Sequence, residues 1–327
     1  MIFDADKDVC ILSSEAITWI DKNTFEQTKA INIYISNIHI GKLDTIIFAQ
    51  NAFYRLIPSQ RKLDKLIDIG QYVSDFSIIP EKSIIYFVLQ DTSDPGLNNS
   101  INYFSFDGEH KKNIFNIKEL QSDSFELRKI ECFEKEDTLF MVYNANQAFA
   151  GSYIKTVNLN TGQIVNEQIN TDFASGDLYQ ALQPDYIRSI YRQSTQNTQI
   201  VRVTDAFTYK NKLEWSFDSG TPVDITPDNL LHYDNQLQKA SLYDWNSNVP
   251  KLQFKTPFTS IFYNNVNLFK HWMSITSREN DEGYLFDFLG KAQYKLTSIE
   301  GINQVLYADE KIAVAYTKDN KLLLYKL

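Results

Sequence analysis

Histidine offers the widest range of chemistry of any side chain, and this sequence contains four of them: His39, His110, His232 and His271. None has a second histidine or a cysteine at the spacing of a zinc or haem site, so the sequence predicts no such centre. His39 and His232 lie in strand-like apolar runs, where we expect each ring to pack inside the fold or against a neighbouring unit. His110 lies in a polar turn and is expected to be exposed.

The stretch with the most metal-like character is Asp91–Ser100, which reads DTSDPGLNNS. Its Asp and Asn oxygens are of the ligand type that calcium prefers. The stretch lacks the alternating ligand spacing and the terminal Glu of a calcium loop, and Pro95–Gly96 accounts for it as an extended turn. The sequence therefore predicts no metal site and no cofactor.

Motifs for nucleophilic and nucleotide chemistry are not found. The sequence contains no Gly-x-Ser-x-Gly elbow, no Walker loop and no Gly-x-Gly-x-x-Gly turn. A Ser-His-Asp triad assembles in space, so sequence spacing neither supports nor excludes one. We assign no catalytic residue, and the sequence favours a protein that is not an enzyme.

The charge balance directs attention to protein partners. The 327 residues include 32 Lys and Arg against 41 Asp and Glu, which gives a net charge of −9. A phosphate-binding surface needs a concentrated basic stripe, and the densest basic run, Arg61–Leu66, already contains an acid. Nucleic acid and anionic membrane are therefore not predicted as partners. An acidic protein more naturally meets a basic partner.

The cysteines and the first residues bear on location. Cys10 and Cys132 are the only cysteines, and each sits in an apolar run typical of a buried, reduced thiol. The first residues carry acids where a secretory signal carries bases. No apolar run approaches the ~18 residues of a membrane span. From these features we expect a cytoplasmic protein.

An internal repeat in the sequence reveals the strands that would position any functional site. Residues Gln304–Lys326 and the first twenty-one residues share a hydrophobic run, an acidic turn, an alternating run, a polar turn and another hydrophobic run. The pattern recurs along the chain as eight units of about 41 residues, close to the length of a propeller blade. The last unit lacks a fourth strand.

The strand patterns within a unit predict an all-β fold. The second strand is nearly all apolar, the third alternates, and the fourth is the most polar, which suits a protected outer edge. The sequence therefore predicts a single β-propeller domain over residues 1–327, with eight four-stranded blades by repeat count and seven as the alternative. A two-domain β-sandwich and a β-helix are weaker alternatives. Only Ser59–Lys65 and Ile114–Leu120 show short helical patterns.

Three stretches carry a resemblance to known proteins: Val157–Ile169, Ile17–Glu26 and Leu242–Trp245. They resemble blades of the Trp-Asp repeat and quinoprotein-like propeller superfamily. The Gly-His and Trp-Asp pairs of that superfamily do not recur here. The resemblance implies the architecture and no functional residue, and the matching chain ends are then expected to be adjacent first and last blades.

Loops at one face of the predicted propeller supply the candidate site. They are the second-to-third-strand loops and the loops that join blades, and function often lies on loops of a rigid scaffold. Their acidic residues and one exposed-looking aromatic residue form the predicted partner-binding set: Asp91, Asp94, Phe149, Asp172, Asp177, Asp218, Glu279, Asp281 and Glu282. A solvated acidic rim is the alternative interpretation.

The leading hypothesis is a non-enzymatic scaffold that binds a basic protein through this face and is otherwise monomeric. A bacterial immunity or antitoxin-like protein is one specific form of it. The alternative is a propeller enzyme, either a hydrolase, a lyase or a quinoprotein-like enzyme, with its site at the central channel. A third interpretation is a subunit of a larger assembly, held by an outer blade edge.

Overall fold

The computed structural model describes the chain as a series of segments. They cover residues 2–40, 45–79, 83–89, 100–105, 112–116, 125–133, 138–145, 152–158, 161, 163–170, 178–182, 186–193, 198–205, 208–218, 223–226, 229–234, 236–255, 265–277, 281–289, 292–319 and 321–327. Their regular structure is all β apart from one 3-10 turn, η1 (Pro58–Gln60). No helix among these segments is long and apolar enough to cross a bilayer.

The described strands form eight separate sheets, seven with four strands and one with three. Each sheet uses strands that are consecutive in the chain, paired in chain order. The fold class predicted from the repeat is therefore correct, and the three-stranded sheet is the last one, as the sequence indicates. Eight blades stays a prediction, as does the single domain over residues 1–327.

The chain divides into two compact units. The first comprises Met1–Leu12, Thr18–Ala30 and Phe217–Leu327, and the second comprises Ser13–Ile17 and Ile31–Ser216. The strands that lie wholly or mainly in the first unit are β1 (Ile2–Ala5), β2 (Asp8–Leu12), β3 (Ala16–Asp21), β4 (Gln27–Asn32), β21 (Val223–Ile225), β22 (Asn229–Asp234), β23 (Lys239–Asp244), β24 (Leu252–Lys255), β25 (Asn265–Phe269), β26 (Trp272–Ser277), β27 (Glu282–Asp287), β28 (Gln293–Leu296), β29 (Ile302–Ala308), β30 (Ile312–Thr317) and β31 (Leu322–Lys326).

The second unit holds the remaining four sheets. Their strands are β5 (Ile35–Ile40), β6 (Thr45–Ala49), β7 (Ala52–Ile57), β8 (Lys62–Asp68), β9 (Val73–Ile79), β10 (Ile84–Leu89), β11 (Ser100–Ser105), β12 (Lys112–Asn116), β13 (Phe125–Phe133), β14 (Thr138–Ala145), β15 (Ser152–Asn158), β16 (Ile164–Asn170), β17 (Leu178–Leu182), β18 (Tyr186–Gln193), β19 (Thr198–Asp205) and β20 (Asn211–Asp218).

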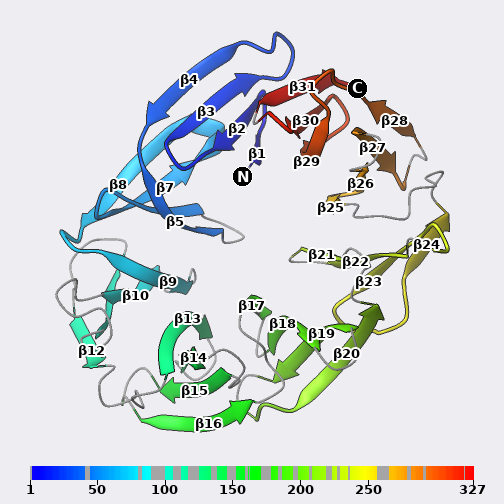
Figure 1. The fold of residues 1–327 in the computed structure, drawn as a ribbon. Coiled ribbons are helices and arrows are strands. Elements are labelled where there is room, and N and C mark those ends of the chain that lie inside the picture. Colours follow the sequence, from blue (N-terminus) through cyan, green and yellow to red (C-terminus); the bar gives the residue numbers. More distant parts are fainter. Residues whose placement is uncertain are drawn as a thin grey trace. The chain divides into compact units, whose positions relative to one another are not determined.

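Neighbouring sheets meet through their first strands. In the first unit β21 contacts β25, β25 contacts β29, and β29 contacts β1 (Figure 1). In the second unit β5 contacts β9, β9 contacts β13, and β13 contacts β17. Two of these junctions carry a carboxylate: Asp75 accepts the N–H of Ile130 at 2.8 Å, and Asp224 accepts the N–H of Leu268 at 2.6 Å. The contact of β1 with β29 confirms that the first and last sheets are neighbours.

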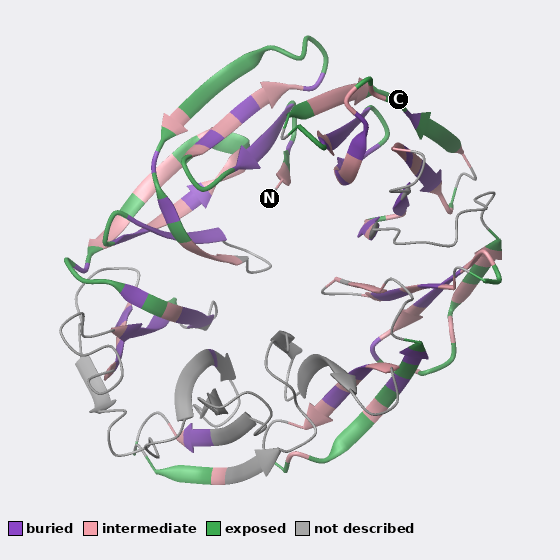
Figure 2. Cartoon of the chain, viewed as in Figure 1, coloured by how far each residue is buried: buried purple, intermediate pink, exposed green. Residues whose placement is uncertain are grey.

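Burial follows strand position within a sheet. Every residue of β2 and β6 is buried, whereas β4 is exposed along almost its whole length (Figure 2). The cores lie between sheets: Val9 and Ile11 of the first sheet pack with Tyr307, Ile312 and Val314 of the last. The second strand is apolar because both of its faces pack against other residues. The fourth strand is polar because it lies at the outer edge and has few neighbours.

The two helical expectations were largely wrong in the described residues. Most of Ser59–Lys65 belongs to β8, and Ile114–Asn116 belongs to β12, while residues 117–120 lie outside the described segments. The register between β7 and β8 shifts between Phe53 and Tyr54, so β8 contains an extra residue. This irregularity spaces Leu63, Leu66 and Ile67 like the apolar face of a helix.

Candidate functional site

Three of the nine predicted partner-binding residues lie in the described segments: Asp218, Asp281 and Glu282. Asp218 is exposed at the last position of β20, where the chain leaves toward β21. Asp281 and Glu282 are adjacent at the start of β27. The other six lie outside the described residues, namely Asp91, Asp94, Phe149, Asp172, Asp177 and Glu279.

Asp281 is held in place by backbone geometry. Its φ of 55° is left-handed, and its carbonyl accepts the N–H of Ile302 at 2.9 Å. Gly301 also has a left-handed φ of +73°, and a Cβ added there would lie 2.8 Å from the Asp281 Cβ. The Asp281 carboxylate forms an ion pair with Lys318 of the turn between β30 and β31. Asp281 therefore joins the last two sheets at this end.

Glu282 and Glu300 are also paired with lysines. Glu282 forms an ion pair with Lys295 and accepts a hydrogen bond from Tyr284, and these bonds hold the pKa of Glu282 below its usual value. Glu300 accepts hydrogen bonds from Ser298 and Lys321, which lower its pKa to about 2. Both carboxylates are therefore ionised at neutral pH.

Sequence reasoning did not identify an exposed apolar residue that adjoins one of these pairs in the chain. Ile299 directly precedes Glu300 in the link between β28 and β29, and the residue is fully exposed. We call the surrounding surface the linker face, and define it as Asp281, Glu282, Lys295, Ile299, Glu300, Lys318 and Lys321. The linker face combines one unburied apolar side chain with three ion pairs.

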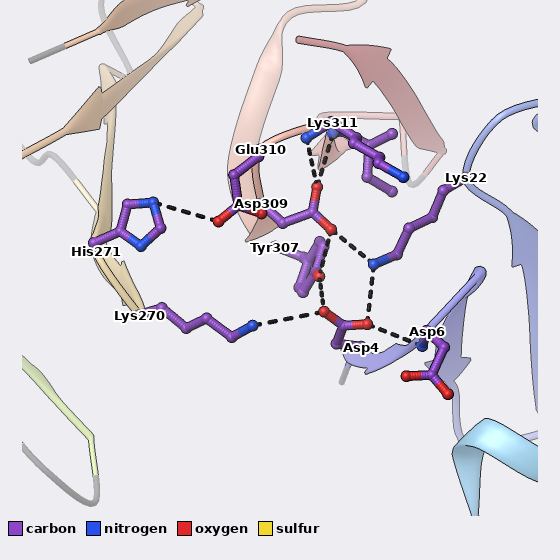
Figure 3. Close-up of polar contacts among 10 residues, drawn as sticks. Asp4, Asp6, Lys22, Lys270, His271, Tyr307, Asp309, Glu310 and Lys311 are labelled. Atoms are coloured by element: carbon purple, nitrogen blue, oxygen red, sulfur yellow. Dashed lines mark hydrogen bonds and ion pairs between the residues drawn. The ribbon is translucent and has the colours of Figure 1, made fainter. Parts of the chain in front are cut away.

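A second polar cluster joins the first and last sheets at the opposite end of their strands (Figure 3). The Lys22 ammonium lies 2.8 Å from Asp309 Oδ2 and 3.0 Å from Asp4 Oδ1. The Tyr307 hydroxyl donates to Asp309 Oδ2 at 2.9 Å, and Asp309 Oδ1 accepts the backbone N–H groups of Lys311 and Ile312. We call Asp4, Lys22, Tyr307 and Asp309 the closure cluster.

The electrostatics of the closure cluster favour one protonation state. Burial acts to lower the pKa of Lys22, but its hydrogen bonds to Asp309 and Asp4 outweigh burial and raise that pKa above its usual value. Burial acts to raise the pKa values of Asp4 and Asp309, and Lys22 reverses this, so both lie below the usual value. Burial and Asp309 raise the pKa of Tyr307. No member is poised near neutrality, so the arrangement is suited to holding sheets together.

Two further side chains border the closure cluster. Lys270 lies 3.6 Å from Asp4 Oδ2. His271 Nε2 lies 3.6 Å from Glu310 Oε1 and 3.9 Å from Asp287 Oδ1. Both residues come from the turn between β25 and β26, so the contacts extend the closure cluster to a third sheet.

Two of the remaining histidines pack as expected. The His232 ring stacks on Phe217, with ring centroids 4.2 Å apart, and burial lowers the pKa of His232 to about 4. The His39 ring lies 6.1 Å from that of Phe76 in the next sheet. His110 lies outside the described residues. Among the described segments no group of three His, Cys, Asp or Glu side chains is arranged to hold a metal ion.

The cysteine prediction is tested at one position. The Cys10 thiol is fully buried in β2, and burial together with Asp8 raises its pKa to about 12. Cys132 lies in β13, but its side chain is outside the described residues.

Solved structures establish the class of protein. The chain is similar to the structure of the Dos1 propeller, with a TM-score of 0.55, 10 % identity, and coverage of 98 % of this chain and 89 % of that one. It is also similar to Saccharomyces cerevisiae Sqt1, with a TM-score of 0.53, 10 % identity, and coverage of 100 % and 95 %. Dihydro-heme d1 dehydrogenase NirN aligns with a TM-score of 0.55, 12 % identity, and coverage of 99 % and 72 %.

These likenesses show the fold alone, because every identity is far below the level at which function transfers. The chain has a β-propeller architecture, as the sequence predicts. No protein-family profile and no curated protein matches the chain. The fold is compatible with a protein-binding scaffold.

Proposed function

We propose that this protein is a non-enzymatic binding scaffold whose linker face holds a basic partner protein. The observation that carries the proposal is Ile299, a large apolar residue that is fully exposed and directly precedes Glu300, one of three linker-face acids paired with lysines. Interfaces typically concentrate their binding energy in a few apolar anchors surrounded by polar contacts that exclude water. Ile299 takes the role of apolar anchor that we expected for Phe149.

The charges around Ile299 support a basic partner. The carboxyl groups of Asp281, Glu282 and Glu300 each pair with an exposed lysine of the same chain. Because such surface pairs contribute little, about 0–1 kcal/mol each, a partner Lys or Arg can replace the internal lysine at small cost. The net charge of −9 would also accelerate the approach of a basic protein.

The finer form of the proposal is an immunity or antitoxin-like protein that neutralises a basic partner in the bacterial cytoplasm. The acidic composition and the exposed anchor support it. In this form the protein is monomeric until it binds. The partner then covers the linker face.

Active sites that use general acid–base catalysis often hold a titratable group poised near neutral pH, and such a group would support the competing hypothesis of a propeller enzyme. In the closure cluster the pKa values of Lys22, Tyr307 and Asp309 are displaced away from neutrality. The pKa of His232 is displaced as well. These directions favour structural roles for the polar clusters of the described residues.

The test is affinity purification from the native host followed by binding measurements with the purified partner. Ile299→Asp removes the anchor and adds a charge on the linker face. Leu289→Asp is the matched control, because Leu289 is 73 % exposed in the turn at the other end of β28. We expect Ile299→Asp to weaken binding at least about tenfold and Leu289→Asp to leave it unchanged.

Two results would overturn the proposal. One is equal binding by wild type and Ile299→Asp, which would remove the linker face from the interface. The other is the absence of any stoichiometric partner, with a small molecule retained by the purified protein instead. Affinity that is insensitive to salt would contradict the basic character of the partner.

A further inference from the structure

The last sheet has no fourth strand among the described residues, whereas each of the other sheets has one. Seven described sheets contain four strands, whereas the sheet of β29, β30 and β31 contains three. Its outermost strand, β31, pairs with β30 in an antiparallel register from Ile312↔Lys326 to Tyr316↔Leu322. Among the described residues, no strand pairs with the other edge of β31.

The backbone hydrogen bonds fix which groups point to that edge. Thr317 N–H donates to the carbonyl of Lys321, and Leu327 N–H donates to the carbonyl of Lys311. Residues of an antiparallel strand alternate between groups directed to one neighbour and to the other. The odd-numbered residues of β31 therefore face β30, and the backbone groups of Leu322, Leu324 and Lys326 point to the open edge.

The side chains of β31 are mostly apolar. It reads Leu-Leu-Leu-Tyr-Lys, with a single charge at its end, whereas the outer strand β8 carries Lys62, Asp64, Lys65 and Asp68. Tyr325 packs against the core shared with the preceding sheet, and Leu324 packs against the core shared with the first sheet. Both faces of β31 thus contact a core, and Leu322 and Lys326 at its two ends are exposed. Its middle residues carry no charge, although natural proteins normally protect such edges with charge.

The charge at the carboxyl end of β31 is opposite in sign to the charge at the carboxyl end of the third strand in other sheets. Third strands of other sheets end in Asp21, Asp244 and Asp287, whose carboxylates accept backbone N–H groups of the turn into the fourth strand. β31 has Lys326 at this position. Lys326 and the neighbouring Lys311 are exposed, and neither forms an ion pair with a described residue.

We propose that the edge of β31 is a strand-addition site for an extended segment of a partner protein. The segment pairs antiparallel with β31 through Leu322, Leu324 and Lys326 and takes the fourth-strand position. Its amino end lies beside Lys326 and carries acidic residues, and apolar residues alternate along it as in the fourth strands present. Backbone pairing supplies affinity and the side chains supply specificity. This site is separate from the linker face and does not rest on it.

The probes are two synthetic peptides with the sequence of residues Ala292–Ser298, which contains β28. One is extended at its amino end by two aspartates and the other by two lysines. Hydrogen exchange of the full chain is followed with each peptide. We expect the aspartate peptide to slow exchange of the Leu322, Leu324 and Lys326 amides at least about tenfold, and the lysine peptide to bind more weakly.

Two variants test the mode of binding. Leu324→Pro removes an edge N–H without removing a β30–β31 bond, and edge strands tolerate such a proline. Its matched control is Gln293→Pro on β28, where Asp287 N–H bonds Ala292 and so directs the Gln293 N–H outward. Leu324→Pro should abolish peptide binding and Gln293→Pro should preserve it. Lys326→Asp, which keeps the backbone intact, should reverse the preference between the two peptides.

Several outcomes would overturn the proposal. Amides of Leu322, Leu324 and Lys326 that are already protected in the monomer would mean that this chain itself covers the edge. Protection that rises with protein concentration without peptide would assign the edge to a second copy. Equal protection by both peptides, or binding unaffected by Leu324→Pro, would exclude the strand-addition geometry.

Discussion

The ammonium of Lys22 lies 2.8 Å from the carboxylate of Asp309, 287 positions further along the chain. Both side chains are only 5 % exposed. Lys22 lies in the turn after the third strand of the first sheet, and Asp309 lies in the turn between the first two strands of the last sheet. This buried ion pair ties together the two sheets in which the chain begins and ends.

Asp309→Asn should strongly destabilise the fold. The substitution keeps Oδ1, which accepts the N–H groups of Lys311 and Ile312, but it leaves the buried Lys22 ammonium without its nearest carboxylate. Breaking one partner of a buried pair costs about 3–5 kcal/mol. The measurement is the shift in the urea unfolding midpoint.

Asp244→Asn is the control for this change. Asp244 accepts the N–H of Asn246 in the turn after the third strand of its sheet, so the variant tests amide replacement at a strand end without a buried cation. It should cost less than about 0.5 kcal/mol. Adding Lys22→Met to Asp309→Asn should recover part of the loss. A midpoint equal to wild type for Asp309→Asn would show that the ion pair does not stabilise the junction.

The contribution of the closure cluster to the stability of the fold should depend on pH. The folded-state pKa values of Asp4 and Asp309 lie below the ordinary value of 3.8, so their stabilisation is present above that value and is lost as the pH falls through the folded-state values. The pKa of Lys22 is raised above 10.5, so its stabilisation is lost only as the pH rises through the folded-state value. The difference in unfolding midpoint between wild type and Asp309→Asn should therefore be widest between about pH 5 and pH 9. A constant difference down to about pH 2 would contradict this assignment.

Protonation of His232 should lower the stability of the fold over a second, less acidic pH range. Its folded-state pKa is lowered to about 4 by burial, against 6.5 for the ordinary group. The unfolded chain therefore binds the proton first, and stability should fall by about 2–3 kcal/mol as the pH drops from 6.5 to 4. His232→Phe, which retains a ring next to Phe217, should flatten the melting temperature across this window. The same acid loss in both proteins would assign the titration to another group.

Gly301 should be intolerant of a side chain for two separable reasons. Its φ of +73° is left-handed, and a Cβ there would lie 2.8 Å from the Asp281 Cβ. Gly70 shares the left-handed φ, at +71°, but a Cβ there would have nothing within 4 Å. Gly70→Ala should cost about 1 kcal/mol from backbone strain alone, and Gly301→Ala should cost clearly more. Equal costs in thermal unfolding would show that Asp281 moves aside freely.

The fold could be predicted from the sequence because its signals are local. Burial of all of β2 and exposure of β4 follow from packing within a unit of about 41 residues, and the pattern repeats. The helical expectation at Ser59–Lys65 holds only for Ser59–Gln60 of the 3-10 turn η1, because Lys62–Lys65 pairs with β7 as a strand. A short apolar run alone does not distinguish a strand from a helix segment, since the distinction depends on pairing with a neighbouring strand.

The polar sites could be predicted only in part because their partners are distant in sequence. Asp281 and Glu282 were recognised as acidic loop residues, but their pairing with Lys318 and Lys295 depends on how strands and sheets align. Asp309 reads as an ordinary turn residue, and nothing local distinguishes it from Asp244. The exposure of Ile299 likewise depends on the path of the link that carries it.

The burial of Cys10 gives this protein an internal reporter. Its thiol has no exposed surface and a pKa of about 12, so a thiol reagent reacts only when β2 separates from its neighbours. In a Cys132→Ser background, the labelling rate then counts how often the first sheet opens. Since that sheet is tied to the last one through Lys22 and Asp309, the same rate measures how long the two ends of the chain stay together.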